Sequence, residues 1–414
     1  MKLLVLTSNY PRKNALNNGV FIHHQVKALQ ELGVECHVLL LHNWYPPMGL
    51  HKFHASWRDG EALATTFFEE YDGVNIHAVP MYVRLPGRLF KENFYHRAAR
   101  DIARYIKATP ALHGAEWMYA HFLTDNGYIG TKVKELTGIK LAAIARGDDV
   151  HAWPEYHPHL VSNIRYVFEH ADVMLANNKG LARDAMKFAD KVKPDIKIAY
   201  NGVDYKAFRF EPLTASQQQE ARAKYNLPAD KKILMCIGRA EETKGWIELL
   251  QAVAENKQLL SDWVLLAVTD QYPGYRHVAV ADKVKELGIS DMVRVQYFVL
   301  PEQVKELYRV SNAFILPSYN EGISNAVMEA MASGLWVITT DVGGHAEIIQ
   351  HGKGGFLMRP QSMEDVTANL RYLVANYDEQ HAAISNAAMA SMEQLGDYRH
   401  NAKILLGYLE ASGK

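Results

Sequence analysis

The sequence predicts an α/β protein with two doubly wound domains. Two observations support this fold class. Short apolar runs alternate with helical patterns, and a polar stretch near the middle of the chain interrupts the alternation before it starts again. Such alternation is typical of parallel sheets covered by helices. The length of 414 residues allows two or three domains with ample cores.

The first half of the chain is expected to begin with a strand. The apolar run in MKLLVLTSNYP is too short for the core of a signal peptide. Helical patterns cover Val20–Leu32 and Ile129–Leu136. The expected strands are Leu3–Leu6, Cys36–Leu41, Trp117–Ala120, Leu141–Ile144, Val173–Ala176 and Ile196–Ala199. We therefore expect a first domain over residues 1–210.

A second series of strands follows the polar segment 211–230. The expected strands are Lys232–Ile237, Trp263–Val268, Val293–Tyr297, Ala313–Leu316 and Val337–Thr340, and a helical pattern covers Asp397–Leu409. We expect a second domain over residues 211–394. Sheets of this kind bind ligands at the carboxyl ends of their strands. The cleft between two facing domains is then the default site.

Composition excludes several classes of protein. Hydrophobic residues make up 48% of the chain and charged residues 22%, as in soluble globular proteins. No stretch approaches the roughly 20 apolar residues of a membrane span. The two cysteines, Cys36 and Cys236, lie in apolar runs, so we expect buried free thiols in a reducing, cytoplasmic compartment and no cysteine zinc site.

The segment 317–359 is the most informative part of the chain. Glu321 and Glu329 have seven residues between them, and Gly322 permits close approach of a ligand to the backbone. Ser324 or Asn325 is expected to cap a helix whose free N–H groups favour an anion. This arrangement indicates a site for a phosphorylated ligand.

The two carboxylates suit different parts of such a ligand. Glu329 lies four residues after Asn325, on the same helix face, where it can accept hydrogen bonds from ribose hydroxyls. Glu321 is placed to meet a sugar ring. Taken alone, Glu329 fits a surface helix equally well. The surrounding sequence AVMEAMASG is apolar nearly all round, which favours a buried helix whose glutamate needs partners.

Two cations follow the strand Lys232–Ile237. Gly238-Arg239 ends this strand, and Lys244-Gly245 lies five residues further on. An arginine fork and a lysine point charge can neutralise a diphosphate leaving group. A solvated charged loop is the alternative, supported by the neighbouring Glu241 and Glu242.

In the first half, polar residues follow several predicted strands. No GxGxxG motif follows the first strand, which weakens a nicotinamide-cofactor interpretation. Gly19 precedes the first helix, where it either lets a phosphate or sugar approach the backbone or simply forms a turn. The segment Asn201-Gly202-Val203-Asp204 is first of all a turn signal. The residues expected on the rim that faces the cleft are His121, Asp125, Arg146 and Asp149.

These pieces together resemble the family 4 glycosyltransferases of the GT-B fold, over nearly the whole chain. They occur in the family's order: the Gly19 loop, Arg146-Gly147-x-Asp149, Asn201-Gly202-Val203-Asp204, Gly238-Arg239 with Lys244-Gly245, the Glu321 and Glu329 pair, Gly343-Gly344, and Gly352 with Gly355-Phe356-Leu357. The combination is highly specific. It most resembles members that act in exopolysaccharide biosynthesis.

The resemblance implies two Rossmann-like domains that face a cleft, with a C-terminal helix, about 395–414, crossing back to the first domain. It implies a retaining enzyme of the hexosyltransferase type that needs no metal or cofactor and takes a nucleotide diphosphate sugar as donor. Arg239, Lys244 and backbone amides of Ile323, Ser324 and Asn325 are then expected to hold the diphosphate. Glu329 is expected to bind ribose and Glu321 the sugar, while Gly19 approaches the phosphates from the first domain.

Three positions depart from the family pattern. Arg146 stands where a histidine is common, and arginine cannot act as a base near neutral pH. It can still bind an anionic acceptor or a sugar. Trp336 replaces a common proline and Phe298 a common glycine, so we expect both to reshape the nucleotide pocket.

The segment 81–107 bears on the acceptor. Lys and Arg outnumber acidic residues in it by seven to two, and aromatic residues lie between them. Such a segment can lie on an anionic bilayer and bring the enzyme to a saccharide or polyprenyl-linked acceptor. A helix with a solvated basic face is the alternative. We expect a cytoplasmic protein, and both alternatives for this segment stand: attachment to the inner membrane face, or a solvated helix. We expect no nucleic acid partner.

Three functions compete on these residues. The first is retaining glycosyl transfer in the synthesis of a cell-surface polysaccharide or glycolipid. The second is a nucleotide-sugar 2-epimerase of the same fold, which the two glutamates and the Asn-Gly-Val-Asp segment disfavour. The third is a non-catalytic sugar-binding protein, which the intact set Arg239, Lys244, Glu321 and Glu329 disfavours.

Overall fold

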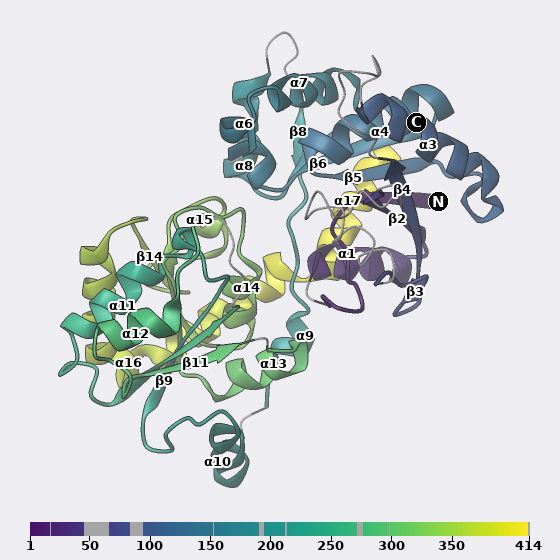
Figure 1. Cartoon of the computed structure of the whole chain (residues 1–414). Helices are drawn as coiled ribbons and strands as arrows, with labels where there is room; N and C mark the ends of the chain where they lie inside the picture. Colours follow the sequence, from purple (N-terminus) through teal and green to yellow (C-terminus); the bar gives the residue numbers. More distant parts are fainter. Residues whose placement is uncertain are drawn as a thin grey trace, which may run out of the picture. The chain divides into compact units, whose positions relative to one another are not determined.

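The computed structural model describes residues 1–16, 18–44, 66–82, 94–151, 153–189, 194–211, 213–270, 276–297 and 299–412. The chain divides into two compact units, Met1–Tyr200 with Arg399–Lys414 and Asn201–Tyr398 (Figure 1). The domain boundaries expected from sequence were 1–210 with about 395–414, and 211–394. Residues 201–210 lie with the second unit because the ring of Phe208 packs edge-on against Tyr308, with centroids 5.8 Å apart.

The first unit is built on a sheet whose strand order is β3-β4-β2-β1-β5-β6-β7-β8. The short β3 pairs antiparallel with β4, and the other pairs are parallel. The strands are β1 (Lys2–Thr7), β2 (Glu35–Trp44), β3 (Glu70–Tyr71), β4 (Val74–Tyr82), β5 (Trp117–His121), β6 (Lys140–Ala145), β7 (Val173–Ala176) and β8 (Ile196–Ile198). The chain order reverses between β1 and β5, which makes their carboxyl ends the expected ligand site.

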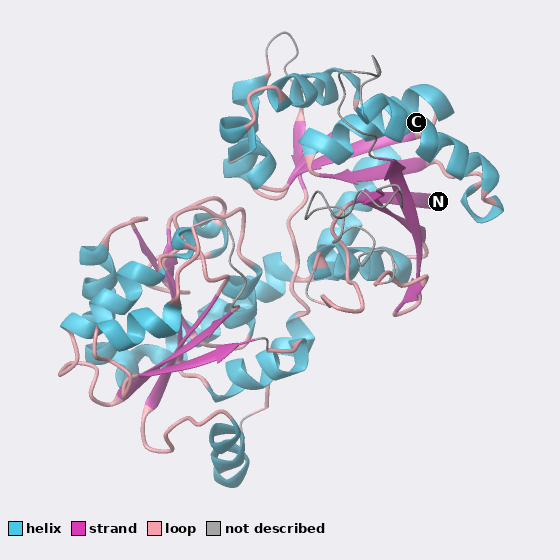
Figure 2. Ribbon diagram, in the orientation of Figure 1, coloured by secondary structure: helices cyan, strands magenta, loops and turns pink. Residues whose placement is uncertain are grey.

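Helices cover both faces of this sheet (Figure 2). They are α1 (Val20–Glu31), α3 (Phe94–Ala108), α4 (Tyr128–Thr137), α5 (Asp148–His151), α6 (Trp153–Tyr156), α7 (Leu160–His170), α8 (Lys179–Ala185) and α17 (Tyr398–Ala411), with shorter turns at η2 (Pro110–Leu112), η3 (Leu123–Gly127) and η4 (Met186–Phe188). The C-terminal helix α17, yellow in Figure 1, belongs to this unit from Arg399 onward, and Arg399 Nε donates to Glu31 Oε2 at 2.7 Å.

The second unit has a fully parallel sheet with the strand order β11-β10-β9-β12-β13-β14. The strands are β9 (Lys232–Ile237), β10 (Trp263–Thr269), β11 (Val293–Tyr297), β12 (Ala313–Leu316), β13 (Trp336–Thr340) and β14 (Phe356–Met358). Here the chain order reverses between β9 and β12. Both strands are followed by predicted site residues, so the fold brings those residues to one place.

The helices of this unit are α9 (Tyr205–Phe208), α10 (Ala215–Lys224), α11 (Trp246–Glu255), α12 (Val280–Glu286), α13 (Pro301–Val310), α14 (Asn325–Ala332), α15 (His345–Ile348) and α16 (Met363–Ser391), with shorter turns at η5 (Glu242–Lys244) and η6 (Met392–Gly396). Trp246, Trp336, Tyr308 and Phe314 are among the largest fully buried side chains of its core. The prediction of two doubly wound α/β units is therefore confirmed.

One sequence-based expectation about this unit is wrong. Trp336 was expected to reshape the nucleotide pocket, but it is the first residue of β13, at the amino end of the strand. Its ring is fully buried and stacks on Phe356, with centroids 4.9 Å apart. The larger side chain fills the core and lies away from the ligand-binding edge. Phe298, the other expected departure, lies outside the described residues.

Both cysteines are buried and unbonded, as expected. Burial raises the pKa of the Cys36 thiol to about 12, so it remains protonated at neutral pH. Within the described ranges, no helix is long and apolar enough to cross a membrane.

Candidate functional site

The predicted ligand site of the second unit lies at the carboxyl ends of β9, β12 and β13. Three loops, over residues 238–245, 317–325 and 341–345, follow these neighbouring strands. Parallel strands deliver their carboxyl ends to the same edge of a sheet, so residues far apart in sequence meet there.

The two cations of the loop after β9, Arg239 and Lys244, differ in how far their side chains are exposed. The Arg239 side chain is 63% exposed and forms a 3.0 Å ion pair with Glu241. Its backbone carbonyl accepts a hydrogen bond from Trp246 Nε1 at 2.8 Å, which fixes the start of the loop. Gly245 ends the loop with a φ of 70°, and a Cβ there would lie 2.2 Å from the Pro317 carbonyl oxygen. Only glycine permits this approach of the two loops.

Lys244 and Glu321 form a buried ion pair across these loops. Lys244 Nζ lies 2.6 Å from Glu321 Oε1, and the two side chains are only 17% and 13% exposed. Burial raises the pKa of Glu321, but the attraction of Lys244 outweighs it and the net pKa is lowered. The carboxylate is thus ionised at neutral pH, and the fold brings two separately predicted site residues into direct contact.

The segment after β13 braces the Glu321 loop. The Gly344 N–H donates to the Gly322 carbonyl at 2.7 Å. A Cβ on Gly343, whose φ is 57°, would lie 2.2 Å from the carbonyl oxygens of both Glu321 and Gly322. This contact gives Gly343-Gly344 a physical role, because any side chain at position 343 would displace the loop.

His345 is a site residue that the sequence analysis missed. It is fully buried; its Nδ1 donates to the Thr340 carbonyl at 2.8 Å, and its Nε2 accepts the Ser324 N–H at 3.2 Å. Burial lowers the pKa of His345, which agrees with a neutral ring that donates at one nitrogen and accepts at the other. The available signal was a polar aromatic residue directly after the Gly343-Gly344 turn.

The start of helix α14 differs from the expected cap. Ser324 occupies the N-cap position, but its side chain makes no capping hydrogen bond, so the prediction of a side-chain cap there is wrong. Its N–H is already bonded to His345, which leaves it engaged within the loop. Asn325 is the first helical residue, and its buried Oδ1 has no hydrogen-bond partner among the described residues. A buried acceptor of this kind is available to a ligand donor.

Glu329 lies on the second turn of the same helix, half-buried against two tyrosines. Burial raises the pKa of Glu329 to about 7, although an interaction with the Tyr308 hydroxyl opposes the rise. Glu329 in turn raises the pKa of Tyr398 and adds to the burial effect there. A carboxyl group held near its point of half-ionisation is unusual for a surface residue and typical of a functional site.

In the first unit the predicted residues surround the carboxyl ends of β1, β5 and β6. Gly19 precedes α1 with a φ of 61°, and a Cβ there would lie 2.4 Å from the Asn9 carbonyl oxygen. The glycine is therefore required by the packing of the helix start against the loop after β1. Asn126 Nδ2 donates to Ser8 Oγ at 3.3 Å, which ties that loop to the segment after β5.

His121 and Arg146 form the centre of a buried polar network. Arg146 donates to His121 Nδ1 from Nη2 at 2.7 Å and from Nε at 3.1 Å, and also from Nη2 to Gln25 Oε1 at 3.1 Å. Burial and the nearby guanidinium lower the pKa of His121, so its ring is neutral. Because Nδ1 accepts, Nε2 carries the proton, and it has no hydrogen-bond partner within the described part of the chain.

Asp149 and Asp125 have different surroundings. Asp149 is fully buried and accepts hydrogen bonds from the N–H groups of Leu123, Arg146 and Gly147 at 2.7 to 2.9 Å, so it holds two strand ends together. Asp125 is half-buried in the turn η3 and accepts the Tyr95 hydroxyl at 2.9 Å. Burial raises its pKa.

Backbone strain accompanies this second cluster. Phe122, directly after His121, has a φ of 72°, which is uncommon for a residue with a large side chain. Strained residues of this kind concentrate at functional sites. No group of three or more His, Cys, Asp or Glu side chains in the described ranges is arranged to hold a metal ion. Metal-free chemistry stays a prediction of the resemblance.

Comparisons with known proteins match this architecture. Residues 217–389 match the family described as glycosyl transferases group 1. A glycosyltransferase of Bacillus subtilis, named as the putative teichuronic acid biosynthesis glycosyltransferase TuaC, is 26% identical over 369 residues, 88% of this chain and 87% of its own length. A D-inositol 3-phosphate glycosyltransferase of Nocardioides is 29% identical over 368 residues, 81% of this chain and 76% of its own length.

Solved structures share the fold. The Anabaena protein Alr3699/HepE, solved in complex with UDP and glucose, superposes with a TM-score of 0.75 at 16% identity and covers 99% of this chain and 100% of its own. Sucrose-phosphate synthase of Thermosynechococcus elongatus gives a TM-score of 0.74 at 18% identity, with 99% and 98% covered. The chain therefore carries a match to the group 1 glycosyl transferases over residues 217–389, and as a whole it has the GT-B fold.

Proposed function

We propose that the protein is a retaining glycosyltransferase of the hexosyltransferase type, which uses a nucleotide diphosphate sugar without a metal ion. The observation that carries the proposal is the buried Lys244–Glu321 ion pair at the carboxyl ends of β9 and β12, beside the exposed guanidinium of Arg239. Cations at this position suit a diphosphate, and the carboxylate beside them suits sugar hydroxyls. The Anabaena protein of the same fold was solved with UDP-glucose, which favours a donor of this class.

Each donor-side residue has a part in this proposal. Arg239 and Lys244 bind the diphosphate, and the amides at the start of α14 assist them. Both cations already have acidic partners, at 3.0 and 2.6 Å respectively. The diphosphate therefore has to draw Arg239 from Glu241 and share Lys244 with Glu321. Glu329 accepts the ribose hydroxyls, and Glu321 accepts hydroxyls of the transferred sugar.

The chemistry follows from the charges. The bond between the anomeric carbon and the diphosphate oxygen breaks, and negative charge develops on the diphosphate, where Arg239 and Lys244 stabilise it. The acceptor oxygen attacks from the same face of the sugar and gives its proton to the leaving phosphate. No protein base is needed, which agrees with a buried arginine at position 146.

We assign the acceptor side to the first unit, around His121 and Arg146, while Gly19 is assigned to the donor phosphates. The neutral His121 presents an unpartnered Nε2–H there, which is a donor suited to a hydroxyl. The relatives reported above are named for teichuronic acid biosynthesis and for D-inositol 3-phosphate, so a saccharide or lipid-linked acceptor in glycan synthesis is the proposed class. Asp125 and Asp149 support this cluster through the loops that they hold.

Transfer is tested with a panel of nucleotide sugars and a mixture of saccharide and polyprenyl phosphate acceptors. We expect release of nucleoside diphosphate that depends on acceptor, and a product whose anomeric proton shows the donor's configuration by NMR. An epimerised nucleotide sugar in the absence of acceptor would support the epimerase instead. An inverted product would contradict the retaining mechanism.

We also propose peripheral attachment to the inner face of an anionic membrane through the segment 81–107. In its described part, the aromatic side chains Phe94, Tyr95 and Tyr105 pack on the core, so only the basic face of α3 is left for a bilayer. Flotation with anionic and zwitterionic liposomes tests this attachment. Flotation that ignores lipid charge, or that persists after charge reversal at Arg97, Arg100 and Arg104, would contradict it.

A further inference from the structure

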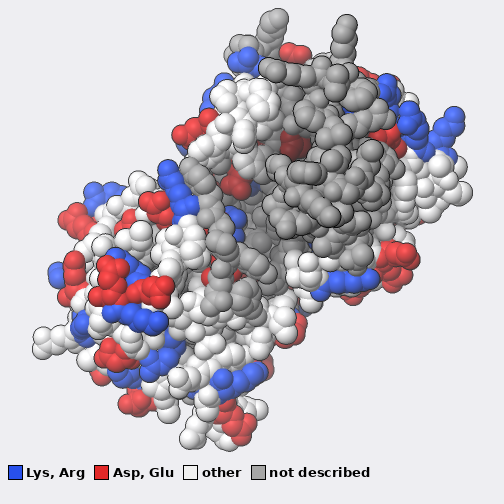
Figure 3. Space-filling model, viewed as in Figure 1, with Lys and Arg blue, Asp and Glu red and all other residues white. Residues whose placement is uncertain are grey.

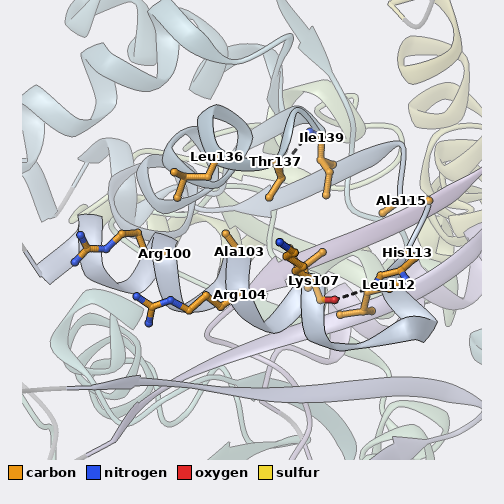
Figure 4. A pocket seen from close by; sticks show the side chains of 12 residues that line it. Arg100, Ala103, Arg104, Lys107, Leu112, His113, Ala115, Leu136, Thr137 and Ile139 are labelled. Atoms are coloured by element: carbon orange, nitrogen blue, oxygen red, sulfur yellow. Dashed lines mark hydrogen bonds between the residues drawn. The ribbon is translucent and has the colours of Figure 1, made fainter.

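A cavity of about 590 Å³ lies on the first unit, between the C-terminal half of α3, the turn η2 and the end of α4 (Figure 4). Its residues precede β5 and β6, so it lies at the amino ends of these strands. The residues around His121 and Arg146 lie at the opposite, carboxyl ends. This position separates the cavity from the proposed acceptor cluster of the same unit.

The α3 wall of the cavity is basic. Arg100, Ala103, Arg104 and Lys107 lie along one side of this helix, because residues three and four apart share a helix face. The first and last of the three cations, Arg100 and Lys107, lie seven positions apart, or about 10 Å along the helix. Figure 3 shows Lys and Arg atoms gathered at the side of the first unit where Figure 1 places α3.

The opposite side and floor of the cavity are mainly apolar. The apolar residues there are Ile106, Leu112, Ala115, Leu136 and Ile139, and Gly114 and the polar His113 and Thr137 complete the lining. Leu136 is 53% exposed, whereas Ala115 and Ile139 also pack against the buried core of the unit. Figure 4 shows Leu136 and Ile139 facing the basic helix across the cavity, with Leu112 and Ala115 at one end.

Arg104, in the middle of the basic wall, has an acidic partner on the same helix. Asp101 accepts from Arg104 Nη1 at 3.0 Å, and the Arg104 side chain remains 74% exposed. An exposed pair of this kind is weak and yields to a stronger anion. Phosphate is such an anion, since guanidinium groups bind it through paired, charge-assisted hydrogen bonds.

We propose that this cavity is a binding site for a single anionic phospholipid. Its phosphate lies against Arg100, Arg104 and Lys107, and one acyl chain covers Leu136 and Ile139. The size suits a ligand of this kind, because small-molecule sites range over about 300–1,000 Å³. The inference rests on the proposed membrane attachment and deepens it, since it replaces a diffuse charged surface with a defined pocket at the edge away from the acceptor cluster.

The test uses short-chain dihexanoyl lipids below their micelle concentration, so that bilayer adsorption plays no part. Binding of dihexanoyl phosphatidic acid to the full-length protein is measured by calorimetry and compared with dihexanoyl phosphatidylcholine and inorganic phosphate. We expect the anionic lipid to bind at least tenfold more tightly than either. If inorganic phosphate binds as tightly as the anionic lipid, the site recognises only an anion. If the choline lipid binds as tightly, the site is only an apolar groove. Either result overturns the proposal.

Two kinds of variant separate the pocket from general charge. Ala103→Trp fills the cavity without changing charge, and Leu136→Ser removes apolar surface at an exposed position that folding tolerates. Each is expected to weaken the anionic lipid at least tenfold, as is the double variant Arg100→Glu, Arg104→Glu. The matched control Arg183→Glu, Lys187→Glu changes the same charge at exposed positions elsewhere in the unit and should stay within twofold of the wild type.

The outcomes also distinguish the pocket from attachment. If the wild type floats with anionic liposomes but does not bind the soluble lipid, the pocket is refuted while attachment stands. If folded Ala103→Trp and Leu136→Ser bind the soluble lipid as the wild type does, the assigned cavity is wrong. Thermal unfolding of each variant establishes that it is folded before binding is measured.

Discussion

Replacing Glu329 by glutamine should stabilise the donor-free protein while weakening its donor affinity. Burial raises the pKa of this carboxyl from 4.5 to about 7. The folded state therefore holds the proton more tightly than the unfolded state, and the free energy of unfolding falls as the pH rises from 4.5 to 7 and is level above that. Glutamine has no charge to bury, so the free energy of unfolding of the variant should not fall over this pH range.

The magnitude follows from the shift. The change in pKa corresponds to about 3 kcal/mol at pH 8. The side chain keeps part of its exposure, so we expect a gain of about 1–2 kcal/mol for Glu329→Gln at pH 8. At pH 4 the wild-type carboxyl is protonated in both states, and the two proteins should differ little. Thermal and urea unfolding at both pH values measure the difference.

Donor binding should respond to pH in the opposite direction. Ribose hydroxyls need an ionised acceptor, and the ionised fraction of Glu329 falls from about nine-tenths at pH 8 to about one-tenth at pH 6 for a pKa of about 7. The affinity for a nucleotide sugar should therefore fall about tenfold over this range in the wild type. In Glu329→Gln it should be weak and independent of pH. The donor has no terminal phosphate monoester, so it does not itself titrate here.

Two results would refute this reasoning. One is a wild-type affinity that stays constant from pH 6 to pH 8. The other is a glutamine variant that is less stable than the wild type at pH 8, since that would mean the carboxylate stabilises the donor-free fold. Calorimetry at each pH, with the unfolding curves as a folding control, decides both points.

Three further predictions follow from the same contacts. Lys244→Ala and Glu321→Ala should each lower kcat/KM by about 10²–10³, because each removes a charged contact at the reacting centre; near-normal turnover in either folded variant would reject the assigned roles. Gly343→Ala should raise the donor KM, since its Cβ would meet two carbonyl oxygens at 2.2 Å. The control Gly352→Ala has a φ of 77° but open space around its Cβ, so it should keep the wild-type KM and cost only about 1–2 kcal/mol of stability. Equal KM values for the two variants would show that the position of the Glu321 loop is unimportant. Arg146→Met removes the donors of a buried network and should destabilise the protein by about 1–3 kcal/mol, measured by thermal unfolding; an unchanged melting temperature would contradict a positioning role.

The strands that carry the site were predictable because they are apolar on both faces. Parallel strands buried by helices on both sides give continuous apolar runs, as in Trp117–His121 and Ala313–Leu316. The strand β4 (Val74–Tyr82) was missed because it mixes polar residues with Pro80. Pro80 pairs with His42 of β2 on one side, and among the described residues β3 pairs only with Val74 and Asn75 on the other side, so β4 is an edge position at Pro80 that tolerates proline. The three-residue strand β14 (Phe356–Met358) is too short to give a pattern.

The candidate site was predictable where chemistry and spacing coincide. Arg239, Lys244, Glu321 and Glu329 follow strands or open a helix, and these positions imply a common edge of the sheet. Whether two of them touch depends on loop conformation, which spacing does not encode. The Lys244–Glu321 contact and the displacement of the Ser324 cap by His345 both arise from packing between loops.

The first unit shows the same limit. The expectation for Arg146 concerned its charge, and the structure shows a guanidinium that is almost wholly committed to His121 and Gln25. Such commitments depend on which strands are neighbours, since β1, β5 and β6 meet only in the sheet. Sequence alone placed the residues at strand ends but could not pair them.

The most direct test is a crystal structure of the protein soaked with the nucleotide sugar that the activity panel identifies. The account predicts the diphosphate against Arg239 and Lys244, the ribose hydroxyls on Glu329, and the sugar ring beside Glu321. A donor whose diphosphate lies away from Lys244, or whose ribose does not contact Glu329, would contradict it.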